Sequence, residues 1–256
     1  MGAVRASLRM VALVATTTPI YLGVLFCKPV AWFSTRRSLA IQDFWVRTWA
    51  RACARILGMR ITVDGASPAP PFFLVSNHLS YVDIVVLFSV LDCHFIAKSD
   101  VARWPVMGFL ARTAGTLFIR RESKRDLTRV IPAVQALLGA GRGVVVFPEG
   151  TSTKGDAVAR FKPSLFEVAI LTETPVSYAA LSYVTPDATP PAHLSVCWWG
   201  DMEFMPHLFR LLALPRFDAT VAFGGARITA DDRKVLAARA QRAVEDQFTP
   251  VVGYEA

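Results

Sequence analysis

Two side chains with complementary acid–base chemistry stand five residues apart in this chain. His78 precedes Asp83 in the segment Asn77-His78-Leu79-Ser80-Tyr81-Val82-Asp83. An imidazole accepts a proton near neutral pH, and a carboxylate bonded to one ring nitrogen leaves the other nitrogen free as a base. The spacing therefore predicts His78 as a general base that Asp83 orients. Ser80-x-x-Asp83 also fits the capping pattern of a helix start, so a structural role is the alternative.

A second polar segment follows a run of apolar residues. Gly143-Val144-Val145-Val146 has the composition of a buried strand, and a Pro-Glu-Gly turn comes directly after it. We expect Glu149, Gly150 and Thr151 to offer a carboxylate, backbone N–H groups and a hydroxyl at this turn. Such a loop is a sensible cradle for a polar or phosphorylated head group.

The residues around this turn exclude two common kinds of functional loop. Its glycine spacing does not match a P-loop, and Lys154 stands where a nucleophile elbow built on Ser152 requires glycine. An apolar segment before this turn ends in two guanidiniums, Arg120 and Arg121, and Lys162 is a weaker cationic candidate further along the chain. A guanidinium binds phosphate through two parallel hydrogen bonds, so the two arginines are candidates for an anionic substrate. A solvated charge run at the end of a strand is the alternative.

Apolar runs of strand length alternate with these polar segments. We expect strands at Met59–Val63, Phe72–Val75, Cys93–Ala97, Thr116–Ile119, Gly143–Phe147, Val176–Leu181, Leu194–Trp199 and Ala219–Phe223. Helices are expected at Lys124–Leu138, Pro163–Leu171 and, after a Thr229 cap, Asp231–Phe248. The order predicts an α/β domain over residues 59–256, with a mixed, largely parallel sheet flanked by helices. Ligands bind at the carboxyl ends of such strands, whereas Cys93 and His94 fall inside a strand and are interpreted as core.

The overall composition is more apolar than a soluble core requires. The 256 residues carry a net charge of +8, with 53% hydrophobic and 19% charged residues and a mean hydropathy of +0.39. These values exclude intrinsic disorder and indicate that some apolar surface faces lipid. Four scattered cysteines without histidine at ligand spacing exclude a disulfide scaffold and a metal site, and fit a reducing cytoplasm. Dispersed basic residues without an aromatic–basic motif argue against a nucleic-acid partner.

Residues 1–58 are expected to form a separate, membrane-associated helical segment. The uncharged run Met10–Cys27 is marginally long enough to cross a hydrocarbon core of roughly 30 Å. The following stretch, Ile41–Leu57, separates basic from aromatic side chains: Arg47, Arg51 and Arg55 on one side, and Trp45, Trp49 and Ile56 on another. This separation is typical of a helix in a membrane interface. A surface helix that covers the core is the alternative, and one helix can pack on the domain by one edge and on lipid by another. A helical hairpin within one leaflet suits the length and Pro19 better than a full span, and a cleaved signal peptide is the alternative.

Taken in order, the motifs resemble those of the 1-acylglycerol-3-phosphate acyltransferase family of glycerolipid enzymes. The family pattern N-H-x-x-x-x-D is present at Asn77–Asp83, G-x-x-F-I-x-R nearly complete at Gly115–Arg121, and F-P-E-G-T at Phe147–Thr151. A proline-containing apolar strand follows at Thr174–Tyr178, where Tyr178 stands in place of a second proline. The motif-bearing core covers about residues 72–182.

The resemblance implies transfer of an acyl chain from a thioester, acyl-CoA or acyl carrier protein, to the free hydroxyl of a lysolipid. His78 would take the hydroxyl proton and Asp83 would orient His78, without a covalent acyl-enzyme. Asn77 would shape the His78 loop or polarise the carbonyl. Four residues match family positions for the acceptor's glycerol and phosphate: Arg120, Glu149, Gly150 and Thr151. The resemblance implies no metal and no bound cofactor beyond the acyl donor.

The acceptor expected from the resemblance is lysophosphatidic acid, which gives phosphatidic acid. A lyso-ornithine lipid or another lysolipid is the alternative, because the same His–Asp chemistry serves all of them. The expected location is the cytoplasmic membrane, with the active site facing the cytoplasm. A non-catalytic membrane-binding module is the alternative from another class, and such a module would not need His78 or Asp83.

Overall fold

The computed structural model describes residues 2–27, 30, 33–120 and 124–252. Its α-helices are α1 (Gly2–Cys27), α2 (Thr35–Leu57), α3 (Val82–Val90), α4 (Pro105–Thr113), α5 (Lys124–Gly139), α6 (Glu167–Leu171), α7 (Ala192–Ser195), α8 (Phe204–Ala213) and α9 (Arg233–Glu245). Short 3₁₀ helices are η2 (Ser99–Arg103) and η3 (Pro163–Leu165). Its strands are β1 (Met59–Asp64), β2 (Phe72–Ser76), β3 (Cys93–Lys98), β4 (Leu117–Ile119), β5 (Gly143–Val146), β6 (Val176–Val184) and β7 (Phe217–Phe223).

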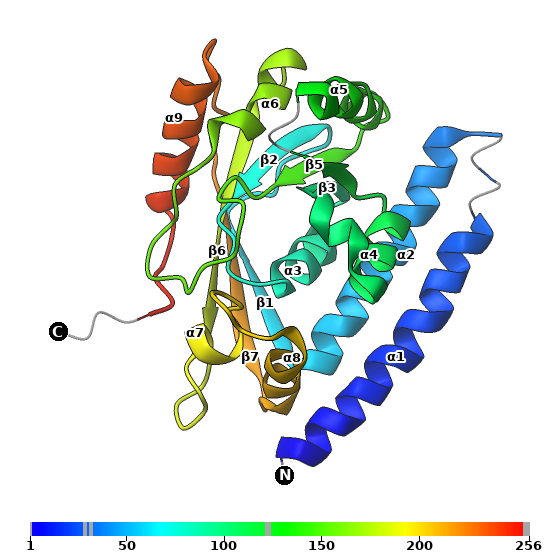
Figure 1. Cartoon of the computed structure of the whole chain (residues 1–256), viewed down its shortest axis with the longest axis vertical. Coiled ribbons are helices and arrows are strands. Elements are labelled where there is room, and N and C mark those ends of the chain that lie inside the picture. The colour runs from blue at the N-terminus through cyan, green and yellow to red at the C-terminus, as the bar shows by residue number, and fades with distance from the viewer. Residues whose placement is uncertain (1, 28–29, 31–32, 121–123, 253–256) are drawn as a thin grey trace.

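Within the described residues, one mixed sheet organises the domain (Figure 1). Its strand order is β1-β7-β6-β2-β5-β3-β4, and every pair is parallel except the antiparallel pair β6–β7. Helices cover both faces, as expected for parallel strands whose two faces are apolar. The predicted α/β fold with a largely parallel sheet is confirmed.

Strands β2 and β5 form the buried centre of this sheet. All residues of β2 are buried, with Phe72 and Leu74 in the hydrophobic cluster on one face and Phe73 and Val75 in the cluster on the other. Their pairing is parallel, so the loops after both strands leave the sheet at the same edge. The parallel pairing of β2 with β5 therefore places the segment after Ser76 beside the segment after Val146.

Strand β6 is longer than its neighbour β2, and this length matters for the site. Ser76, the last residue of β2, pairs with Ala179, and β6 continues to Val184 while pairing with β7. The second half of β6 therefore passes beside the loop that follows β2. We predicted a strand ending at Leu181, which is three residues short.

The prediction of a strand at Leu194–Trp199 is wrong. Helix α7 ends at Ser195, and the residues after it are irregular. Pro191 precedes this helix, and the fixed φ of proline favours a helix start. Val196 and Cys197 are fully buried in the cluster on the α3 side rather than in the sheet. A run of apolar residues indicates that the segment is buried, but it does not show whether the segment pairs with a strand.

Two helix predictions differ from the structure in detail. The expected helix at Pro163–Leu171 divides into η3 and α6, with Phe166 between them. The last helix begins after Asp232, not after Thr229, because the Asp232 carboxylate accepts hydrogen bonds from the N–H groups of Lys234 and Val235. The helix at Lys124–Leu138 is confirmed as α5.

Helices α1 and α2 pack as a hairpin against one side of the domain (Figure 1). The Trp49 indole N–H donates to the Thr17 hydroxyl over 3.1 Å, and the Trp45 ring lies against Gly23. Helix α1 is continuous through Pro19. Trp45 and Trp49, which we expected to contact lipid, therefore pack between the two helices.

The basic residues of the hairpin also have partners in the domain. Arg47 pairs with Asp92 at 2.7 Å, and Arg51 donates to the Ser89 carbonyl at 3.1 Å, so both face the end of α3. At the start of α1, Arg9 donates to carbonyls of the last turn of α8, including that of Leu214. A cation at a helix C-terminus satisfies its free carbonyls and complements the dipole.

Candidate active site

The His78–Asp83 pair lies in the loop between β2 and α3. His78 Nδ1 is 2.7 Å from Asp83 Oδ2. The imidazole is 20% exposed, whereas the carboxylate is fully buried in the first turn of α3. Because a carboxylate only accepts hydrogen bonds, Nδ1 carries the proton and Nε2 holds the free lone pair. Among the described residues Nε2 makes no hydrogen bond, so this nitrogen is available as a base.

The same carboxylate also holds the loop that precedes α3. Asp83 Oδ2 accepts the backbone N–H groups of Leu79 at 2.7 Å and Ser80 at 3.1 Å. The N-cap residue of α3 is Tyr81, which makes no side-chain capping bond, so the capping alternative is met only by the bond from the Ser80 N–H to Asp83. The hydroxyl of Ser80 is buried and has no partner within the described part of the chain.

The imidazole of His78 rests on the ring of Phe147. Their centroids are 4.2 Å apart and their planes differ by 11°. Phe147 follows β5 directly, so the parallel β2–β5 pair carries both the base and its support. Stacking on one face and the Asp83 bond at one edge together fix the direction in which Nε2 points.

Asn77 joins the His78 loop to β6. Its side-chain amide donates to the Leu181 carbonyl at 2.9 Å, and its side-chain oxygen accepts the Leu181 N–H at 2.7 Å. The residue is fully buried. This geometry supports the loop-shaping role expected for Asn77, since both ends of its amide are occupied.

The loop after Phe147 closes against the His78 loop. Gly150 has φ +82°, which favours glycine, and its N–H bonds to the Phe147 carbonyl at 3.2 Å. The Thr153 N–H bonds to the His78 carbonyl at 3.0 Å. Thr151 is exposed between these two anchors. The loop therefore presents an exposed polar side chain close in sequence to a backbone contact with His78.

Glu149 differs from the exposed carboxylate expected at this turn. It is 3% exposed, and its Oε1 accepts the Ala159 N–H at 3.3 Å, while Oε2 has no hydrogen-bond partner in the described structure. Burial raises the pKa of Glu149 to about 9, against the opposing effect of the Ala159 and His78 amides. The group is therefore a neutral carboxylic acid at neutral pH in the unliganded protein.

Arg120 stands apart from this network. It follows the edge strand β4, with β3 between β4 and β5. Its side chain is 67% exposed and its Nε lies 3.4 Å from the Asp126 carboxylate. Lys162, the weaker candidate, is exposed next to the turn, since its N–H bonds to the Pro148 carbonyl. Both cations are accessible to an anionic ligand. Arg121 lies outside the described residues.

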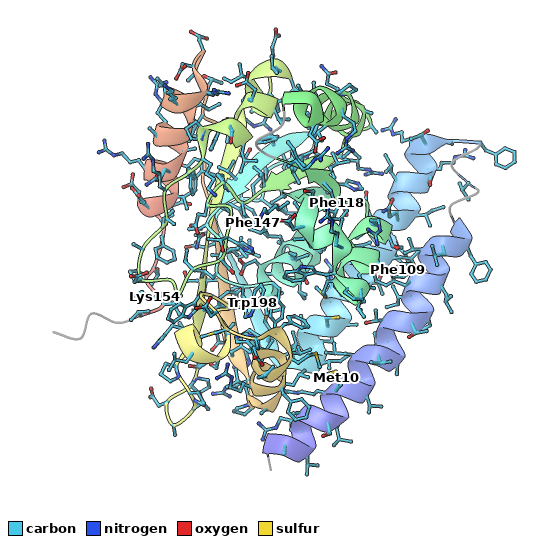
Figure 2. All side chains as sticks on the ribbon, viewed as in Figure 1. Met10, Phe109, Phe118, Phe147, Lys154 and Trp198 are labelled. Atoms are coloured by element: carbon cyan, nitrogen blue, oxygen red, sulfur yellow. The ribbon has the colours of Figure 1, made fainter. Side chains whose placement is uncertain are left out.

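Two features of the site were missed from the sequence. The Tyr183 hydroxyl donates to Asp83 Oδ1 at 2.6 Å. The Trp198 backbone N–H bonds to the Leu79 carbonyl, and its carbonyl accepts the Ser152 hydroxyl, so this segment bridges both loops. Figure 2 labels Trp198 and Phe147 among all the side chains. A tyrosine in an apolar strand is the available signal for the first, because a buried hydroxyl needs a partner.

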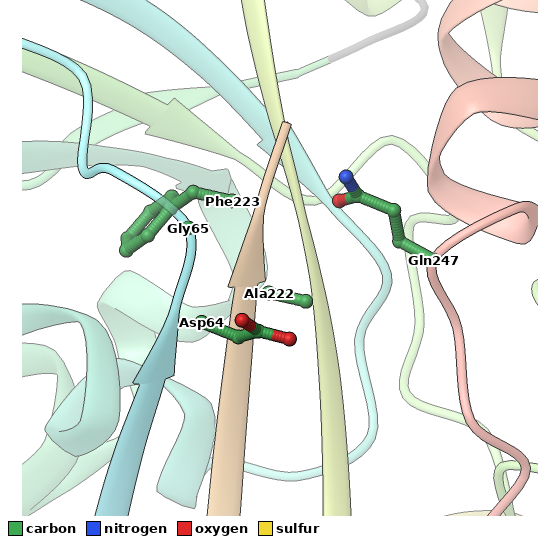
Figure 3. A pocket seen from close by; sticks show the side chains of 5 residues that line it. All are labelled: Asp64, Gly65, Ala222, Phe223 and Gln247. Atoms are coloured by element: carbon green, nitrogen blue, oxygen red, sulfur yellow. The ribbon is translucent and has the colours of Figure 1, made fainter. Parts of the chain in front are cut away.

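Two other histidines, His94 and His207, have structural surroundings. His94 is buried in β3 and lies 3.5 Å from the Asp43 carboxylate of α2. His207 is fully buried, bonding through Nδ1 to the Tyr81 hydroxyl and through Nε2 to the Cys197 carbonyl. No group of three metal-ligating side chains occurs among the residues described. A small pocket at the carboxyl ends of β1 and β7, lined by Asp64 and four other residues, contains none of the predicted site residues (Figure 3).

Comparisons with known proteins identify the family. A sequence profile described as Acyltransferase matches residues 60–182. The lyso-ornithine lipid O-acyltransferase of Rhizobium meliloti is 35% identical over 85% of this chain and 74% of its own length. The chain belongs to the glycerolipid acyltransferase family. The resemblance inferred from the four motifs is therefore confirmed.

Two further relatives describe the range of this acyltransferase family. The 1-acyl-sn-glycerol-3-phosphate acyltransferase of Neisseria gonorrhoeae is 31% identical over 66% of each chain. The crystal structure of the 1-acyl-sn-glycerophosphate acyltransferase PlsC from Thermotoga maritima matches with a TM-score of 0.67 over 96% of this chain and 98% of that one. Their identity is 18%, so this likeness concerns the fold.

Proposed function

We propose that this acyltransferase moves an acyl chain from an acyl thioester to the free hydroxyl of a lysolipid, with His78 as general base. The observation that carries the proposal is the free Nε2 of His78. Its other nitrogen is held at 2.7 Å by a buried carboxylate, and its ring is stacked on Phe147 beside the polar loop. A fixed tautomer with one accessible lone pair is the arrangement that general-base catalysis needs.

The reaction follows from this geometry. Nε2 of His78 removes the proton from the acceptor hydroxyl as its oxygen bonds to the thioester carbonyl carbon. The Asp83 carboxylate stabilises the imidazolium that forms. The carbon–sulfur bond then breaks, and the departing thiolate takes the proton from Nε2. The acceptor is the nucleophile, so the protein supplies none, in keeping with the Ser152 hydroxyl being bonded to the Trp198 carbonyl.

The first candidate acceptor is lysophosphatidic acid. The exposed guanidinium of Arg120 supplies positive charge, and the loop at Gly150 and Thr151 supplies polar groups next to His78. Neutral Glu149 would donate a hydrogen bond to an acceptor oxygen rather than accept one. A lyso-ornithine lipid is the second candidate, favoured by the name of the Rhizobium meliloti relative.

Acyl transfer by purified protein in detergent tests the reaction and its acceptor together. Labelled acyl-CoA and acyl carrier protein are each offered with lysophosphatidic acid, with lyso-ornithine lipid and with an equimolar mixture. We expect product from one lysolipid to dominate the mixture and to disappear in His78→Ala. Equal activity in that variant, or no product with any donor, would refute the proposed function.

We also propose that the α1–α2 hairpin holds the enzyme on the cytoplasmic face of the membrane within one leaflet. Val4, Leu8, Val11 and Val14 are each at least 60% exposed along one side of α1. Helix α1 passes the length and composition test for a membrane span. However, both of its ends contact the domain, through Arg9 at α8 and through the Tyr21 hydroxyl at the Leu110 carbonyl. An in-plane position leaves these contacts intact.

Vesicle co-sedimentation tests this placement with the full chain. Leu8→Glu and Val11→Glu should each reduce binding to anionic phospholipid vesicles, because a charge would enter the hydrocarbon region. Val63→Glu is the matched control, since Val63 is an exposed apolar residue on the edge strand β1. Unchanged binding in both α1 variants would exclude this surface as the membrane contact.

A further inference from the structure

Tyr183 is the residue of β6 closest to the catalytic chemistry. Its hydroxyl lies 2.6 Å from Asp83 Oδ1, although 100 positions separate the two residues. The side chain is 1% exposed, and its ring packs edge-on against Phe217 of β7. Because β6 continues past the end of β2, Tyr183 reaches Asp83 from the rigid sheet rather than from the loop.

The two oxygens of Asp83 have different partners. Oδ2 accepts His78 Nδ1 and the backbone N–H groups of Leu79 and Ser80, all from the same loop. Oδ1 accepts the Tyr183 hydroxyl, its one partner in the described part of the chain. A buried charged oxygen without a donor is costly, so the carboxylate has a strong preference for the plane that keeps this bond.

The sheet thus fixes the orientation of the dyad. The same strand holds Asn77 through Leu181 and Asp83 through Tyr183, on either side of His78. We propose that Tyr183 is a positioning residue of the acyl transfer: its hydroxyl sets the plane of the Asp83 carboxylate and thereby the direction of His78 Nε2. This inference rests on the proposed function, in which His78 is the base.

The surroundings of Asp83 keep the Tyr183 hydroxyl protonated, so it can donate its hydrogen bond at every pH at which the enzyme would be assayed. Burial and the charge of Asp83 raise the pKa of Tyr183 well above its ordinary value, so its proton stays in place. Burial, with a smaller effect of Asp83, also raises the pKa of Cys197. Glu149 faces Asp83 as well, and its pKa of about 9 keeps it neutral. Of the groups facing Asp83, His78 is left as the one that exchanges protons in the reaction.

Tyr183→Phe removes the hydroxyl and keeps the ring against Phe217. We expect kcat to fall about tenfold, since a hydrogen bond to a charged group is lost, while KM stays within twofold. Without the hydrogen bond from Tyr183, the negative charge of Asp83 would interact more strongly with the imidazolium of His78 and stabilise it more. The acid limb of the pH–rate profile should therefore move upward by about half a pH unit. A loss of packing alone would not move this limb.

Two comparisons make the result decisive. Tyr178→Phe is the matched control on the same strand, because Tyr178 is partly buried in the cluster on the opposite face of the sheet. It should keep the wild-type kcat and pH profile. In an Asp83→Asn background the added Tyr183→Phe change should have no further effect, because the two residues act as one unit.

The outcomes separate this inference from the proposed function. Wild-type protein without transferase activity, or His78→Ala equal to wild type, would refute the proposed function itself. With His78→Ala inactive, a Tyr183→Phe variant that keeps the wild-type kcat or an unmoved acid limb would overturn the positioning role. A tenfold loss that persists in the Asp83→Asn background would overturn it too, because Tyr183 would then act elsewhere in the fold.

Discussion

The part of the chain that the structure describes contains two histidine–carboxylate pairs, and their surroundings differ in hydrogen bonding and in the exposure of the imidazole. His78 and Asp83 are 2.7 Å apart, the ring is 20% exposed, and both carboxylate oxygens are hydrogen-bonded. His94 and Asp43 are 3.5 Å apart and both buried, and Arg142 lies 3.0 Å from the second oxygen of Asp43. The same two side-chain types therefore make a candidate base at a strand end and a structural contact inside the fold.

Their electrostatics differ as well. Burial raises the pKa of Asp43 to about 7 and lowers the pKa of His94 to about 4, so both groups are driven toward their neutral forms. Asp83 is also buried, yet its four hydrogen bonds stabilise a carboxylate there. The comparison teaches that the proposed catalytic pair differs from the buried pair in the donors to its carboxylate and in the access to its ring.

The largest expected difference between the two pairs is in activity. His78→Ala should lower kcat by about 1000-fold, within the range that general acid–base catalysis contributes. His94→Gln should keep kcat within about threefold, because His94 is buried in β3 and contacts α2 rather than the loop. Initial rates of acyl transfer at saturating acceptor measure both. Comparable losses in the two variants would mean that the pairs do not differ in function.

Replacing the carboxylate of each pair tests the same difference in activity through the partner of each histidine. Asp83→Asn should lower kcat by about 100-fold, because the asparagine amide can donate to Nδ1 and leave the proton on Nε2. Asp43→Asn should leave kcat close to wild type. Both variants are assayed at one pH near 7.5 with thermal unfolding in parallel. Wild-type activity in Asp83→Asn would show that tautomer control by Asp83 is unnecessary.

The sequence predicted the local half of the site and not the distant half. His78 and Asp83 are five positions apart, and the Phe147–Thr151 turn follows its strand directly, so short-range patterns were sufficient. Tyr183 and Leu181 reach the site from about 100 positions away, through the register of β6 against β2. Nothing local in a sequence encodes that register. The fold class was predictable because alternating buried strands and helices determine it.

The same limit applies to the N-terminal hairpin. The spacing of Arg47 and Arg51 correctly indicated that they share a side of a helix. It did not indicate which side meets the domain, and both residues bond to the end of α3. Helical periodicity identifies a face, whereas its partner depends on the tertiary fold.

Glu149 sharpens the comparison, because it lies beside the catalytic dyad but resembles Asp43 electrostatically. Burial raises the pKa of Glu149 from 4.5 to about 9. The folded state thus binds this proton more tightly, and stability is lost as pH rises from about 5 toward 9. Glu149→Gln carries no such proton. Its unfolding temperature relative to wild type should therefore rise by about 10 °C between pH 5 and pH 9.

Glu167→Gln is the control for this measurement. Glu167 pairs with Arg233 near the surface and is partly exposed. Its unfolding temperature relative to wild type should change little over the same pH range, because partly exposed pairs contribute little. If Glu149→Gln also followed the wild type at every pH, the neutral form of Glu149 would be excluded.

The smallest expected effect concerns the pH dependence of the buried pair, and it has opposite signs in its two variants. Between pH 4 and 6.5 the folded protein holds one proton on Asp43, while the unfolded chain holds one on His94. Their contributions therefore cancel in the wild type. In Asp43→Asn the depressed pKa of His94 remains, so stability should fall as pH falls from 6.5 to 4. In His94→Gln the raised pKa of Asp43 remains, so stability should fall as pH rises from about 4 to 7.

Thermal unfolding of the three proteins from pH 4.5 to 7.5 measures this contrast. Relative to wild type, each variant should shift by about 2 °C across the range, in opposite directions. Shifts in the same direction would contradict the neutral forms of Asp43 and His94 in the folded state.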